Sequence, residues 1–117
     1  MPRTFNVKLV GVTKNNNDGS GRQAYIRKFA RRGMPVMLRQ EPSNPYDQNA
    51  IGTWITATVF WIFREAVQLG YLDSRLAEEI SNHLKRGGTA TARIVDITGG
   101  AEGMEAYGVV IEITKSD

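Results

Sequence analysis

A short polar segment between two apolar runs, residues 43–48 with the sequence SNPYDQ, holds the side chains best suited to chemistry. Pro42 and Pro45 restrict its backbone, so we predict a stiff, hydrogen-bonded turn and not a flexible linker. Tyr46 and Asp47 stand side by side on this turn. Because a rigid loop has little entropy left to lose, the pair is a candidate ligand-binding site.

The two side chains favour different parts of one ligand. A carboxylate accepts hydrogen bonds from hydroxyls and repels phosphates, so Asp47 suits a sugar hydroxyl. Tyr46 offers a stacking plane or a hydroxyl that can reach a phosphate. Together they fit the end of a nucleic-acid strand, where a free hydroxyl lies one nucleotide from a phosphate. The structural alternative, left open by the residues alone, is that Asn44, Asp47 and Asn49 only satisfy backbone groups in an Asx-type turn.

A basic stretch is the second candidate surface. Its cations are Arg22, Arg27, Lys28, Arg31 and Arg32. Tyr25 and Phe29 are interleaved with them at helical spacing. Guanidinium groups pair with phosphates and exposed aromatic rings stack on bases, so this helix could bind nucleic acid. The alternative is a solvated helix face with both rings in the core, which we expect for Phe29 and leave open for Tyr25.

Composition limits the chemistry. The 117 residues include no cysteine and one histidine, His83, so neither disulfides nor an ordinary zinc site are expected, and no metal or cofactor is predicted. There is no phosphate-binding glycine loop and no nucleophile motif, which predicts a protein that is not an enzyme. A net charge of +3 permits nucleic-acid binding without requiring it.

Length and hydropathy predict one soluble domain over residues 1–117. The opening residues lack the apolar core of a signal peptide. The most apolar segment, Ile51 to Phe63, is too short to span a membrane. We therefore expect a cytoplasmic protein without membrane contact.

Periodicity predicts eight elements. The expected order is strand 5–13, a helix from residue 20 or 21 to about 32, strand 36–42, a long bent strand or irregular hairpin over 50–63 that ends near 64–66, strand 67–72, helix 74–85, strand 89–97 and strand 107–114. Asp73 or Ser74 should cap the second helix, and a flexible glycine-rich loop should cover residues 98–106. Parallel units would need regular alternation of strands and helices, so the order favours a small, mostly antiparallel barrel or curled sheet.

The sequence LRQEPSNPYDQNAI, followed by LGYLDSRLAEEI, resembles the core motif of the HIRAN domain family. The positions that match in register are Asn44, Pro45, Tyr46, Asp47, Asn49 and Ala50. The resemblance runs from about Phe5 to Ile113 and is to the small stand-alone bacterial members. It implies a mostly β fold with two helices, a small OB-like, largely antiparallel six-stranded barrel.

The resemblance also implies a function: capture of the 3′-hydroxyl end of single-stranded DNA, in DNA repair or replication-stress processing and beside other repair proteins. Asp47 would take the terminal hydroxyl, with Tyr46 and Asn44 holding the last nucleotides. Tyr25 would stack on a base and Arg22 would replace a phosphate-binding arginine. A further position, Tyr71, stands where family members have a histidine.

Three departures from the family support an alternative function. The second stacking aromatic is missing near Thr98 and Gly99, and Ser74 replaces a phosphate-binding lysine. The segment around Phe60–Phe63 is longer and more aromatic than the usual hairpin, and would be extra core, a stacking surface or a dimer contact. The alternative is a protein-interaction domain, or a homodimer formed through Phe60–Phe63, that keeps the fold without binding DNA.

Overall fold

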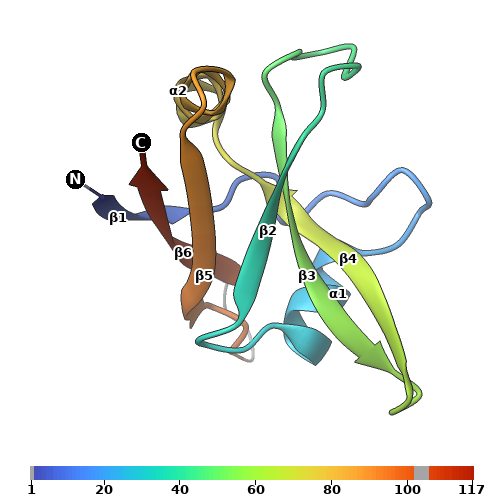
Figure 1. Ribbon diagram of the computed structural model, residues 1–117. Coiled ribbons are helices and arrows are strands. Elements are labelled where there is room, and N and C mark those ends of the chain that lie inside the picture. Colours follow the sequence, from blue (N-terminus) through green and yellow to red (C-terminus); the bar gives the residue numbers. More distant parts are fainter. Residues whose placement is uncertain (1, 102–105) are drawn as a thin grey trace.

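The computed structural model describes residues 2–101 and 106–117 (Figure 1), so residues 102–105 of the predicted glycine-rich loop lie outside it. The element order agrees with the prediction. The elements are β1 (Arg3–Lys8), α1 (Arg22–Phe29), β2 (Pro35–Gln40), β3 (Ile51–Val59), β4 (Phe63–Tyr71), α2 (Ser74–Lys85), β5 (Thr89–Thr98) and β6 (Gly108–Ser116). Neither described helix is long and apolar enough to cross a membrane.

The six strands form one antiparallel sheet in the order β1-β6-β5-β2-β3-β4. The strand β2 joins its two halves, because Pro35 and Val36 pair with β5 while residues 37–40 pair with β3. The mostly β, OB-like fold class is therefore confirmed, but the sheet does not close into a barrel. Within the described part of the chain, its two edges meet only at the bridge between Val10 and Tyr71, with both N–O distances 2.9 Å.

The core lies inside the bend of the sheet. Its fully buried large side chains are mainly β-branched: Ile26, Ile51, Ile55, Leu69, Ile80, Ile94, Val109, Ile111 and Ile113. Such residues favour strands because the branched side chain packs well on a pleated surface. The helix α1 packs on β4 and α2 on β5 (Figure 1).

The helix α2 begins with a side-chain cap. The Asp73 carboxylate accepts a hydrogen bond from the backbone N–H of Leu76 at 3.0 Å, as one of the two predicted capping residues should. Asp73→Ala removes this acceptor, and we expect it to lower the free energy of unfolding by about 1 kcal/mol. Urea unfolding of both proteins measures the difference. Asp73→Asn keeps an acceptor oxygen and should recover most of the loss; equal losses from both variants would contradict the cap.

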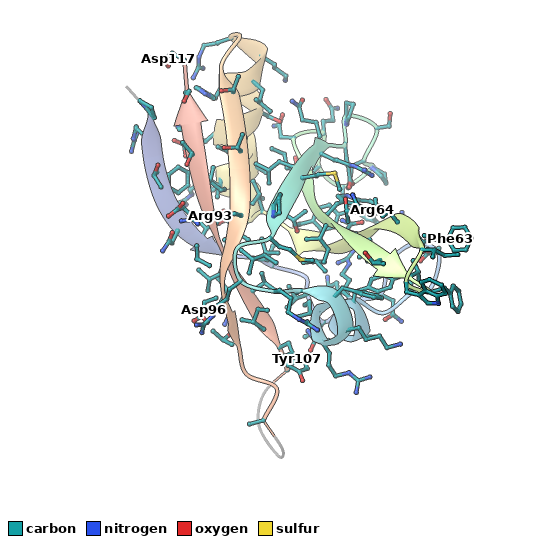
Figure 2. All side chains as sticks on the ribbon, turned by 60° about the horizontal axis from the view of Figure 1, so that its bottom comes forward. Phe63, Arg64, Arg93, Asp96, Tyr107 and Asp117 are labelled. Carbon is teal, nitrogen blue, oxygen red and sulfur yellow. The ribbon has the colours of Figure 1, made fainter. Side chains whose placement is uncertain are left out.

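The aromatic segment forms a hairpin, the second of the two predicted possibilities. Residues 60–62 connect β3 to β4, and the return strand starts at Phe63, four residues before the predicted strand at Val67. Phe60 and Trp61 have φ values of 49° and 54°, a left-handed conformation that bulky residues rarely adopt. Each residue in this conformation lowers the stability of the fold by about 1–3 kcal/mol. Figure 2 shows the end of this hairpin, marked by Phe63, pointing away from β5 and β6.

Candidate functional site

A cleft of about 940 Å³ opens beside the bridge where the sheet fails to close. Three segments line most of it, together with Arg22 from α1: residues 10–17 after β1, the loop 41–47 between β2 and β3, and residues 71–74 at the junction of β4 and α2. Five of the six predicted site residues line this cleft: Arg22, Asn44, Tyr46, Asp47 and Tyr71. The topology thus brings together residues from well-separated parts of the sequence.

The loop 41–47 is held by its own side chains. The Asn44 side-chain oxygen accepts from the backbone N–H groups of Tyr46 and Asp47 at 2.9 and 3.2 Å. Its amide nitrogen donates to Glu41 Oε1 at 3.0 Å. This is the Asx-type arrangement proposed as the structural alternative, so Asn44 fixes the loop that presents its neighbours.

Asp47 is held in place through only one of its oxygens. Its Oδ1 accepts from the backbone N–H of Asn49 at 2.8 Å, whereas Oδ2 has no hydrogen-bond partner among residues 2–101 and 106–117. The carboxylate is half-buried and lines the cleft, and the adjacent Tyr46 is 96% exposed. One acceptor oxygen and one ring therefore remain available for a ligand.

Tyr71 and Arg22 form the wall opposite the loop. The Tyr71 hydroxyl donates to Glu41 Oε1 at 3.0 Å, and the Arg22 guanidinium lies 5.1 Å from the Tyr71 ring centroid. Arg22 also donates from Nε to Asn16 Oδ1 at 2.7 Å and from Nη1 to the Gly11 carbonyl at 2.8 Å. Arg22 is only 6% exposed, and these contacts fix its side chain in the wall.

Comparisons with known proteins agree with this architecture. The HIRAN domain model matches residues 2–110, nearly the whole chain. The chain belongs to the HIRAN domain family. Membership in this family of DNA-binding domains supports nucleic-acid binding. No curated protein was found to match the sequence.

Two solved structures share the fold. The crystal structure of the HIRAN domain of human HLTF has a TM-score of 0.63 and 18% identity, over 96% of this chain and 74% of that one. A crystal structure of a protein from Lactobacillus plantarum has a TM-score of 0.59 and 18% identity, over 97% and 98% of the two chains. At this identity the likeness shows the fold and not the ligand.

Tyr25 is the predicted site residue that does not line the cleft of this HIRAN domain. It is half-buried on α1, with its ring centroid 6.1 Å from that of Phe29, and both rings pack against the core. Tyr25 instead lines a neighbouring groove, which it shares with Tyr71 and Trp54. A nucleotide in contact with Tyr25 would therefore lie outside the cleft.

Sequence reasoning missed Glu41 and Lys14. Glu41 accepts hydrogen bonds from both Asn44 and Tyr71, so one carboxylate ties the loop to the opposite wall. Its place in the quoted HIRAN motif was the available signal. Lys14 lines the cleft from a polar loop that periodicity does not resolve. Ser74, noted only as a missing lysine, also lines it.

Proposed function

We propose that this HIRAN domain captures the free 3′-hydroxyl end of a single DNA strand in the cleft and catalyses no reaction on it. The observation that carries the proposal is the Asp47 carboxylate, anchored through Oδ1 and with Oδ2 unpaired among the described residues. A carboxylate accepts a hydrogen bond from a terminal hydroxyl and repels a terminal phosphate. Only the 3′ end of a DNA strand carries either group, so the carboxylate distinguishes a 3′-hydroxyl end from a 3′-phosphate end.

The other cleft residues support the rest of the terminal nucleotides. Tyr46 is almost fully exposed beside Asp47, so its ring can stack on the last base. Lys14 supplies an exposed cation for the neighbouring phosphate. Asn44 makes three side-chain hydrogen bonds within the loop and contributes by holding Tyr46 and Asp47 in place. A role in DNA repair or replication-stress processing, with repair proteins as neighbours, follows from the family resemblance.

An oligonucleotide titration tests end capture. Single strands of one sequence, labelled at the 5′ end, would carry either a 3′-hydroxyl or a 3′-phosphate. We expect at least about tenfold tighter binding to the hydroxyl end, because the lost hydrogen bond to a charged group alone is worth about 1.5–3 kcal/mol. A circular strand of the same length is the control without ends. Equal affinity for both linear strands would refute the role of Asp47.

The exposed hairpin end favours a second candidate function. Phe60, Trp61, Ile62 and Phe63 are 61–86% exposed, and contiguous apolar surface often marks a partner contact. A protein-interaction or homodimer surface would explain them without DNA. Light scattering over a range of protein concentrations tests this: a mass that doubles, with no binding of any strand at low salt, would support it.

A further inference from the structure

We propose that the aromatic end of the β3–β4 hairpin is a second contact site for the same DNA strand, where bases several nucleotides from the captured end stack. The aromatic tip is defined as residues Phe60–Phe63. The inference rests on the proposed function, since it assigns to the tip the continuation of a strand whose 3′ end lies in the cleft. It concerns the segment for which the departure from the family pattern leaves open extra core, a stacking surface or a dimer contact.

The aromatic tip is built to be exposed. Phe60 and Trp61 are 78% and 86% exposed, and both adopt the left-handed backbone that a turn normally gives to Asn or Gly. Ile62 and Phe63 are 61% and 62% exposed. Keeping two bulky aromatic residues at strained, solvated positions opposes folding, and such strain is typical of functional positions. Figure 2 shows the hairpin end at Phe63 projecting beyond the packed elements.

A continuous surface leads from the cleft to the aromatic tip. The cleft and a second groove share Tyr71 and Glu41, and this groove of about 270 Å³ is also lined by Tyr25 and Trp54. The carboxylates of Asp18, Glu41 and Glu65 line it as well and repel phosphates, so a strand in this groove turns its bases and not its backbone toward it. A third groove of about 240 Å³ shares Tyr25 with the second and reaches Val59, the residue before the tip. A DNA strand that leaves the cleft along these grooves passes the partly buried rings of Tyr25, Trp54 and Phe29 and ends at three exposed rings.

The length of this path matches a short oligonucleotide. Tyr71 and Phe63 are the two ends of β4, eight residues apart. At about 3.3 Å per residue the tip lies roughly 26 Å from Tyr71. Stacked nucleotides rise about 3.4 Å each, so roughly eight of them span this distance, within the usual site size of an OB-type fold.

The chemistry of the tip favours bases over the other occupants. Three of its four side chains are aromatic, and exposed Arg64 follows directly, a combination typical of single-strand binding. Exposed Lys28 on α1 lines the third groove beside it. A stable dimer needs about 800 Å² per partner, whereas the three rings at 62–86% exposure offer roughly 350–550 Å². A dimer of standard size would therefore need further surface beyond these three rings.

Strand length provides the test. We would measure fluorescence anisotropy of 3′-hydroxyl oligothymidines of about 4 and 12 nucleotides with the full chain. The short strand reaches only the cleft, and the long one reaches the aromatic tip as well. Trp61→Ala should weaken binding of the long strand at least about fivefold, the equivalent of the ~1 kcal/mol lower limit for one stacked base, and leave the short strand unchanged. Trp61→Phe keeps a stacking ring and should retain most of the affinity.

The matched control removes both rings without removing the turn. In the double variant Phe60→Asn/Trp61→Gly the residues favour the left-handed backbone, so the hairpin should be kept and the melting temperature should not fall. It should show the same length-specific loss as Trp61→Ala. A loss in either variant that is equal for both lengths would indicate a changed cleft and would overturn the inference.

Other outcomes also decide the matter. If Trp61→Ala binds both strands as the wild type does, the aromatic tip contacts no DNA. Two further results would refute the inference if Trp61→Ala leaves the dependence of DNA affinity on strand length unchanged. A Trp61-dependent molecular mass without DNA would assign the tip to self-association. Trp61-dependent sedimentation with phosphatidylserine vesicles would assign it to a membrane. Failure of the wild type to bind the short strand would instead refute end capture in the cleft, so the two failures are distinguishable.

Discussion

Asp47→Asn is expected to abolish the preference of this HIRAN domain for a 3′-hydroxyl end over a 3′-phosphate end. The amide keeps an oxygen that can accept from the Asn49 N–H, so the turn should remain intact. The negative charge is lost, and with it the strong hydrogen bond to the hydroxyl and the repulsion of the phosphate. Affinity for the hydroxyl strand should fall about tenfold or more, since hydrogen bonds to charged groups are worth about 1.5–3 kcal/mol. Affinity for the phosphate strand should stay level or rise.

Two further variants separate ligand binding from loop structure. Gln48→Ala changes an exposed neighbour in the same loop and should leave both affinities unchanged. Asp47→Ala removes the acceptor for Asn49 as well as the charge, so it reports the sum of both roles. If Asp47→Ala loses the end preference while Asp47→Asn keeps it, the carboxylate serves only the turn and the proposed contact with the hydroxyl is wrong.

The element order could be predicted because local patterns encode it. Alternation in Phe5–Leu9, the cap at Asp73 and the glycines after Lys85 each act within a few residues. The hairpin turn at 60–62 could not be told from a continuous bent strand, because Phe60 and Trp61 are not among the residue types that dominate turns. The order of strands in the sheet, and its failure to close, depend on pairings between distant segments that periodicity does not specify.

The sequence predicted which residues belong to the candidate site better than it predicted what each of them does. The loop around Tyr46 and Asp47 stood out because proline and asparagine mark a rigid turn. That Asn44 makes three hydrogen bonds within the loop follows from geometry that only coordinates reveal. The basic run made Arg22 look like its solvated neighbours, but its partner Asn16 belongs to a polar loop with no periodic signal. The wall residues Arg22 and Tyr71 were therefore predicted through the family resemblance, whereas the contacts that hold Arg22 in place were not.

Arg22 consequently has a structural role that sets the second large prediction. Its side chain joins the segment 10–17, through the Asn16 amide oxygen and the Gly11 carbonyl, to the Tyr71 ring. Arg22→Ala breaks two hydrogen bonds from a charged donor and one cation–π contact. We expect the free energy of unfolding to fall by about 2–4 kcal/mol, a loss on the order of 10 °C in melting temperature. Arg22→Lys should recover little, because an ammonium cannot make the forked contacts of a guanidinium.

The matched control is Arg27→Ala on the same helix, where the side chain is exposed and the change in stability should stay within about 0.5 kcal/mol. Salt dependence then separates the two roles of an arginine. A phosphate contact contributes nearly one unit to the slope of log K against log salt concentration. Two of the Arg22 donors are already occupied, so Arg22→Ala should change this slope less than Lys14→Ala does. Arg22→Ala with wild-type stability and a salt-dependence slope reduced by about one would contradict this assignment and make Arg22 the phosphate ligand. A residue that holds the cleft wall together cannot be replaced without lowering the free energy of unfolding.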